Sequence, residues 1–253
     1  MHEHLDIGCG PSVVLCLDPD NIRIEAGTDN RFSTRLSDQT RNEAGEVLTF
    51  NFPGGEIEVQ TRQVDERLFR VEAVVRSRTK LSRVGLRFKY LPAEPAAWRG
   101  CREQFHWLPN IKRQENQFTG DHNFRSPAVI LTAAEAPAVS FVPDLDRLAT
   151  DRPAPQYLDM GFPDDAPPWI EWGFASQRPV DHVHHEPTGE LFDIPEAGTR
   201  LAATILLGPG EKILSQTSRF LWNRYGQRLA VDPRPQVMPF EKYAEYGYRP
   251  ALE

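Results

Sequence analysis

The sequence predicts an all-β fold: a large two-sheet antiparallel β-sandwich followed by a linker helix. Hydrophobic and polar residues alternate with a period of two along much of the first ninety residues, which is typical of strands with one buried and one solvated face. The chain has 22 prolines and 17 glycines among 253 residues, so turns are frequent and long helices are few. About a dozen or more candidate strands in one domain indicate two stacked sheets.

The alternating strands come first along the chain. Their apolar positions are Ile22 and Ile24; Ile57 and Val59; Phe69, Val71, Ala73 and Val75; and Val84, Leu86, Phe88 and Tyr90. Turn signals rich in Pro, Gly, Asp and Asn lie between them, at residues 18–21, 53–55 and 64–66. The run from Glu46 to Leu91 is therefore predicted to be a meander of neighbouring strands.

The later strands are predicted to be buried more completely. They cover residues 128–132, 138–142, 169–174 and 201–207. The segment at 201–207 is apolar on both faces, as expected of a central strand. Trp169 and Trp172 are three residues apart on one candidate strand, so they are predicted to face opposite sides of the sheet.

A helix is predicted at residues 211–229, after the turn at 208–210. Its apolar stripe comprises Ile213, Leu214, Thr217, Phe220, Leu221 and Tyr225. Prolines follow, and then an aromatic, helix-prone stretch from Pro239 to Tyr248. We therefore expect residues 1–210 to form the sandwich, and residues 211–253 to form a linker helix and the beginning of a further helical domain.

Composition excludes several classes of function. The formal net charge of -7 and the pI of about 5.6 disfavour nucleic acid as a partner. No apolar run approaches the roughly 20 residues that cross a bilayer, so no membrane partner is expected. Cys9, Cys16 and Cys101 show no metal-pair spacing, which favours a reduced, cytoplasmic setting. A secreted or periplasmic setting stays open if a signal peptide has been removed.

Residues 181–186 are rich in histidine. On a strand, His182 and His184 would share a face and supply half of a zinc site, with His185 nearby. The alternative is a solvated loop before the turn at residues 187–190. We predict that no metal is bound at these histidines and that the chain carries no cofactor.

A second polar constellation lies in two irregular segments around residues 105–110 and 119–127. An indole beside amides, carboxylates and a guanidinium is typical of sugar sites, where the ring stacks on a pyranose. The alternative is a loop in which Asp121 pairs with Arg125 and Trp107 fills the core. No catalytic pair or catalytic motif can be named. The candidate sugar-binding residues are His106, Trp107, Asn110, Asp121, His122 and Arg125.

The order of these elements resembles the N-terminal, galactose-mutarotase-like β-sandwich domain of multidomain glycoside-hydrolase-like proteins. The residues that carry the resemblance are the strand at 201–207, the helix through 220–225 and the aromatic segment at 239–248. The resemblance implies a supersandwich that is itself non-catalytic. It implies a domain that binds carbohydrate weakly and packs against a C-terminal helical domain of the same protein, shaping the cleft of a glycoside hydrolase or polysaccharide lyase.

A second function stays open at this point. Free-standing mutarotase-like enzymes use a histidine acid and a glutamate base. The alternative is therefore a self-sufficient sugar epimerase, with His106 or His122 as the acid and a nearby carboxylate as the base.

Overall fold

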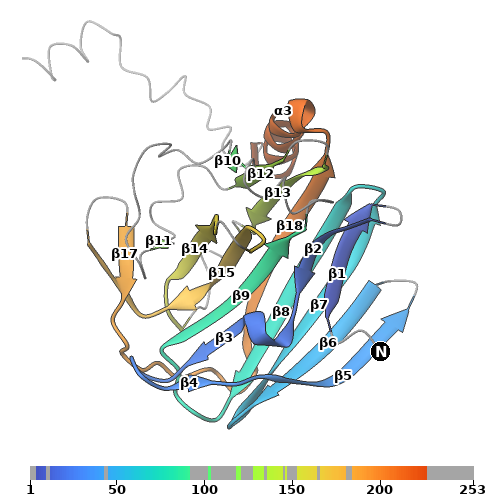
Figure 1. The fold of residues 1–253 in the computed structure, drawn as a ribbon. Helices are drawn as coiled ribbons and strands as arrows, with labels where there is room; N and C mark the ends of the chain where they lie inside the picture. Colours follow the sequence, from blue (N-terminus) through green and yellow to red (C-terminus); the bar gives the residue numbers. More distant parts are fainter. Residues whose placement is uncertain are drawn as a thin grey trace, which may run out of the picture. The chain divides into compact units, whose positions relative to one another are not determined.

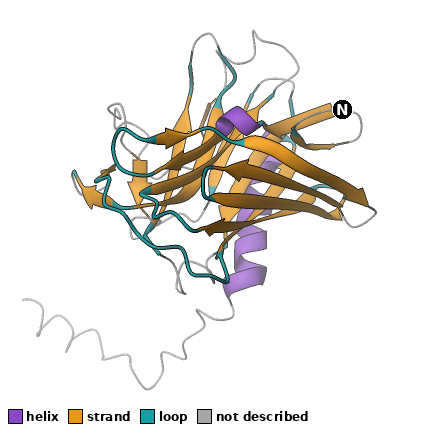
Figure 2. Ribbon diagram, turned by 90° about the horizontal axis from the view of Figure 1, so that it is seen from below, coloured by secondary structure: helices purple, strands orange, loops and turns teal. Residues whose placement is uncertain are grey.

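The structure is a computed structural model that describes residues 4–9, 12–42, 45–91, 102–103, 118–120, 128–133, 136–144, 146, 153–163, 166–180 and 184–226. The chain divides into two compact units, Met1–Leu214 and Ser215–Glu253, and each is described by itself. The fold is all-β, as predicted: Figure 2 shows that strands dominate the described secondary structure, with one longer helix.

Over the residues that the structure describes, the first sheet has ten strands, and every pairing among them is antiparallel (Figure 1). Its main path is β1 (Leu5–Cys9), β2 (Ser12–Leu17), β9 (Arg83–Tyr90), β15 (Trp169–Ala175), β14 (Gln156–Gly161), β11 (Phe118–Gly120), β17 (His184–Pro187) and β16 (Gln177–Pro179). The short strands β3 (Ile22–Glu25) and β4 (Arg31–Phe32) complete it, since β3 pairs with the first half of β9 while β2 pairs with the second half.

The second sheet has eight strands in the described part of the chain, also antiparallel. Its order is β10 (Arg102–Glu103), β12 (Val129–Thr132), β13 (Ala138–Pro143), β18 (Thr199–Gly208), β8 (Leu68–Ser77), β7 (Gly55–Asp65), β6 (Gly45–Phe52) and β5 (Arg35–Asn42). The prediction of a central strand at 201–207 is confirmed, because β18 lies between β13 and β8.

The two sheets stack through one apolar core. Phe141 of the eight-stranded sheet contacts two aromatic rings of the other sheet, with centroid distances of 5.9 Å to Phe88 and 5.5 Å to Trp172. All three side chains have no exposed surface. Alternation explains the arrangement, since Leu86 and Phe88 point into the core while the residues between them lie on the opposite face of the sheet.

The predicted meander is partly wrong. Strands β6, β7 and β8 are sequential neighbours, as expected. The next strand, β9, does not continue that sheet, because the chain crosses at residues 78–82 and β9 pairs with β3, β2 and β15 in the other one. Both sheets bury alternate residues, so the alternating pattern of Val84 to Tyr90 fits either sheet equally well.

The predicted helix is present but more complex than expected. Helix α3 covers Gly210–Leu221, and a π-helical turn, Trp222–Gly226, follows it. Ile213 is fully buried, whereas Leu214, also predicted in the apolar stripe, is 42% exposed. Residues 227–229 and the aromatic stretch at 239–248 lie outside the described residues. Neither this helix nor any other in the described ranges is long and apolar enough to cross a membrane.

Candidate functional site

The residues predicted to bind sugar cannot be located. His106, Trp107, Asn110, Asp121, His122 and Arg125 all lie outside the described residues, so that site stays a prediction. His182 does too.

The other two histidines of the histidine-rich segment lie on β17. His184 is opposite Thr119 and His185 is opposite Phe118. Both histidines are buried, and adjacent strand positions put them on opposite faces of the sheet. They are therefore not ligands of one shared site on a single face.

Chemistry-bearing side chains gather instead on the face of the ten-stranded sheet that points away from the core, here called the outer face. Strands β3, β9, β14 and β15 present alternate residues there. The two tryptophans of β15 illustrate the division, as predicted. Trp172 lies in the core, whereas Trp169 lies on the outer face and is half-buried.

A buried carboxylate, Glu171 on β15, is the centre of this face, and we call its contacts the Glu171 network. Its Oε1 accepts hydrogen bonds from the guanidinium of Arg83, at 2.7 Å, and from the hydroxyl of Tyr157, at 2.7 Å. Its Oε2 lies 2.8 Å from Nε and 2.7 Å from a terminal nitrogen of Arg87. Arg83 Nε also donates to the Tyr157 oxygen at 2.9 Å, and Arg23 approaches Oε1 to 3.8 Å.

The backbone makes room for this network at one position. Gly85 on β9 lies between Arg83 and Arg87, and an added Cβ atom there would be 2.3 Å from the Tyr157 hydroxyl oxygen and 2.9 Å from Glu171 Oε1. Real Cβ atoms essentially never approach so closely. The absence of a side chain at Gly85 therefore lets the tyrosine and the carboxylate meet above the centre of the sheet.

Burial and neighbouring charge act in opposite directions on this cluster. Burial alone would raise the pKa of Glu171, which is 1% exposed, but Arg83, Arg87 and Arg23 together lower it to about 2. Burial also raises the pKa of Tyr157 well above its ordinary value. Glu171 therefore stays ionised and Tyr157 stays protonated throughout the physiological range.

Aromatic rings cover the guanidinium groups of Arg83 and Arg87. The guanidinium carbon of Arg83 lies 4.6 Å from the centroid of the Tyr157 ring and 5.1 Å from that of Phe118. The Arg87 guanidinium carbon lies 3.7 Å from the centroid of the Trp169 ring. These distances fall within the range of cation–π attraction, which holds each guanidinium in place.

Part of the network reaches solvent, and we call Arg23, Arg87 and Trp169 the rim. The side chain of Arg87 is 31% exposed and that of Arg23 is 21% exposed. Each guanidinium has five N–H donors. Glu171 accepts from only some of the donors of Arg87. Glu25 likewise accepts from only some of those of Arg23, through a 2.5 Å contact. The rim therefore combines fixed cationic donors with an indole.

This arrangement can bind polar ligands, but it is a poor acid–base catalyst. A general base works best when its pKa lies near the operating pH. With a pKa of about 2 and almost no exposure, Glu171 holds no proton to give and has little tendency to accept one. Its role in the described structure is to orient Arg83 and Arg87.

Sequence reasoning missed this site, although one signal was present. Glu171 is a charged residue inside the apolar run at 169–174, and a charge in such a run is either exposed or paired. The identity of the partner was not readable, because Arg83 is 88 positions away in the sequence.

A separate pocket among the described residues lies elsewhere, at one end of the sandwich. It has a volume of about 820 Å³ and is formed by the turns that follow β6 and β8 and by residues 193–196. Its lining contains no aromatic side chain, and its ion pair between Arg76 and Glu56 is 42% exposed on both sides. A polar hollow without a stacking platform is a weaker candidate for a sugar than the rim.

Comparisons with known proteins add little. No protein-family model matches the sequence, and the comparison with curated proteins gives no match. Among solved structures, the chain is similar to crystal structures of heparan sulfate lyase HepC from Pedobacter heparinus and of a mutant of it, both with 10% identity and a TM-score of 0.34. The alignments cover 71% and 70% of this chain, respectively, and 22% of the lyase chain. At that TM-score the likeness carries no argument about fold or activity.

Proposed function

We propose that this chain is a non-catalytic, carbohydrate-associated β-sandwich domain that meets its sugar at the rim of the Glu171 network. One observation carries the proposal: Arg87 is stacked on Trp169 and held by Glu171 on the outer face of the ten-stranded sheet. A guanidinium fixed in this way loses little conformational freedom when its remaining N–H groups bind sugar oxygens. Arg87 covers one face of the neighbouring indole, so the part of the indole that stays exposed is the apolar surface offered to a sugar ring.

The finer parts of the proposal come from the resemblance to galactose-mutarotase-like sandwiches. We propose that the parent protein is a glycoside hydrolase or polysaccharide lyase. In it, this domain would pack against a C-terminal helical domain and shape the substrate cleft. The loop residues Trp107, Asp121, His122 and Arg125 would extend the sugar contact. Since half of the cleft would come from the helical domain, the affinity of this chain by itself is expected to be weak.

Nuclear magnetic resonance titration tests the binding. A labelled chain is titrated with neutral and uronate-containing oligosaccharides, and millimolar affinity is expected, which corresponds to about 4 kcal/mol. The Nε–H signal of Arg87 and the indole N–H signal of Trp169 should shift. Shifts confined to the predicted loop residues would show that the sugar binds there and not at the rim. The absence of shifts with every sugar would contradict the proposal.

A pair of matched variants sharpens the test. Arg87→Lys keeps the charge but removes the fork that contacts Glu171, so the sugar-induced shifts should disappear. Arg76→Lys makes the same change in the polar pocket, where Arg76 pairs with an exposed Glu56, and should leave the shifts unchanged. Circular dichroism checks that both variants keep the sheet signal.

Turnover separates this proposal from the epimerase alternative. The chain is expected neither to cleave these oligosaccharides nor to interconvert sugar anomers faster than buffer does. No described residue favours the alternative, since Glu171 is too acidic for a general base. Anomer interconversion that disappears in His106→Ala or His122→Ala would contradict the non-catalytic role.

A further inference from the structure

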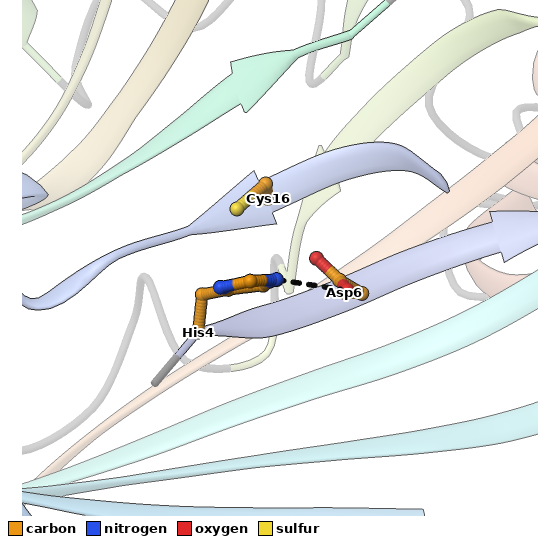
Figure 3. A group of neighbouring side chains, drawn as sticks. All are labelled: His4, Asp6 and Cys16. Atoms are coloured by element: carbon orange, nitrogen blue, oxygen red, sulfur yellow. Dashed lines mark ion pairs between the residues drawn. The ribbon is translucent and has the colours of Figure 1, made fainter. Parts of the chain in front are cut away.

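A second cluster on the outer face lies on β1 and β2, the first two strands in the order of this sheet. Asp6 and Cys16 are directly opposite each other in the antiparallel ladder. Their neighbours Leu5, Ile7, Leu15 and Leu17 are buried in the core, so Asp6 and Cys16 share the outer face. His4 is two residues before Asp6 and therefore lies on the same side. Figure 3 shows the three side chains gathered between the two strands.

We propose that His4, Asp6 and Cys16 form a zinc site. One nitrogen, one oxygen and one sulfur atom from these residues all lie within 4.8 Å of one another. Tetrahedral zinc with bonds of about 2.0–2.3 Å needs ligand atoms about 3.3–3.8 Å apart. His4 Nε2 and Asp6 Oδ2 are 3.2 Å apart, which is close to this spacing.

An independent feature of Asp6 points to a cation. Its Oδ1 is buried and has no hydrogen-bond partner within the described part of the chain. A buried carboxylate oxygen without a partner is destabilising, because it has lost its water and gained nothing in return. A metal ion bound by Oδ1, between Asp6 and Cys16, would satisfy this oxygen.

The charges around the site match a divalent ion. Cys16 donates its S–H to Asp18 Oδ1 at 3.2 Å, and Lys89 neutralises Asp18 through a 2.6 Å contact to Oδ2. On binding, the S–H bond breaks, the thiolate donates its electron pair to zinc and the proton goes to solvent. The carboxylate and thiolate then balance the two positive charges.

The donor set selects the kind of metal. Imidazole, carboxylate and thiolate together suit Zn²⁺, whereas Mg²⁺ and Ca²⁺ prefer all-oxygen ligands. Three protein ligands leave a fourth position for water. Solvent can reach it, because the side chains of His4 and Asp6 are 31% and 27% exposed. Sequence reasoning missed this site because it compared spacings between cysteines alone, while the other ligands come from a neighbouring strand.

Cobalt provides the direct test, since Co²⁺ occupies zinc sites and a cobalt–thiolate bond absorbs in the near ultraviolet. Titration of the tag-free chain with Co²⁺ should produce this absorption at one equivalent, and Zn²⁺ should remove it while Mg²⁺ should not. Bound zinc should also slow alkylation of Cys16. This test uses the unmodified chain. A titration without the thiolate absorption would overturn the proposal.

Variants then assign the ligands. Asp6→Asn and Cys16→Ser should each weaken Zn²⁺ binding by about 100-fold or more, and Cys16→Ser should abolish the cobalt–thiolate absorption. Asp193→Asn is the matched control, because Asp193 is an exposed carboxylate paired with Lys80 at 3.0 Å. It should bind zinc as the unmodified chain does. Unchanged zinc affinity in the Asp6→Asn/Cys16→Ser double variant would overturn the assignment.

Discussion

The two faces of the ten-stranded sheet are buried by different means. On the inner face, Val84, Leu86 and Phe88 have no exposed surface and belong to the apolar core. On the outer face of the same strands, Arg83 and Glu171 are 2% and 1% exposed and are surrounded by charge and hydrogen bonds. One strand, β9, thus contributes to an apolar layer and to an ionic layer with alternate residues.

The comparison shows that these two layers stabilise the fold under different conditions. An apolar side chain contributes through the area that it removes from water, whatever its neighbours are. A buried ion pair contributes little in net terms, because desolvation offsets most of the attraction, but losing one partner is costly. Stability should therefore fall on the inner face when a side chain loses volume, and on the outer face when an ion pair loses one partner.

The largest effect is expected on the inner face. Phe88→Ala should lower the free energy of unfolding by about 4 kcal/mol, since it removes a fully buried ring that contacts Phe141 and leaves a cavity. Denaturant unfolding measures the change. Val64→Ala, at a position that is 51% exposed, should change stability by less than about 0.5 kcal/mol. Equal losses in the two variants would refute the assignment of the core face.

The outer face should respond next most strongly. Glu171→Gln should lower the free energy of unfolding by about 3 kcal/mol. The substitution keeps the shape of the side chain but leaves Arg83 buried without its counter-charge. Glu186→Gln is the matched control, since Glu186 pairs with Arg178, whose side chain is 70% exposed, and should cost less than about 1 kcal/mol. If both substitutions cost the same, the Glu171 network contributes no more than a surface ion pair.

Acid should weaken the outer face alone. The pKa of Glu171 is about 2 in the folded chain against an ordinary 4.5, so its stabilisation is present above about pH 4.5 and is lost as the pH falls toward about 2. About 2 kcal/mol should be lost between about pH 5 and pH 3 through this residue. The same titration of Glu171→Gln should show a loss smaller by that amount. Parallel curves would show that Glu171 is not the source.

The smallest effect concerns the space above the sheet. Gly85→Ala should cost about 1.5 kcal/mol, since the new methyl group collides with the hydroxyl of Tyr157 and pushes it from Glu171. Gly210→Ala, where nothing lies within 4 Å of an added Cβ, should be neutral or slightly stabilising. A neutral Gly85→Ala would mean that the network tolerates displacement and is not tightly ordered.

Local pattern was sufficient to predict the fold class. Alternation located β3, β7, β8 and β9, and the doubly apolar run at 201–207 located a central strand. Alternation did not reveal that β9 leaves the sheet of β8, because the pattern specifies which face is buried and not which sheet a strand joins. That choice depends on pairing with β15, whose residues are more than 70 positions further along the chain.

The site was harder to predict than the fold. The sequence pointed to polar residues around Trp107, which lie outside the described residues, and the alternation from Val84 to Tyr90 indicated only that the opposite face of that strand is solvated. Composition shows that a residue can be charged, but whether it is exposed or enclosed depends on what the fold brings opposite it. For Arg83, Arg87 and Glu171, that information exists only once β9 and β15 are paired.

The position of β18 has a consequence for synthesis on the ribosome. This strand fills the gap between β13 and β8, so it is needed to unite the two halves of the eight-stranded sheet, yet it comes last among the strands of the described residues. Until Gly208 has emerged, β8 and β13 each present an open backbone edge. Such edges recruit other chains. Nascent chains of this protein are therefore expected to depend on chaperones during that interval, and those released before residue 199 should aggregate.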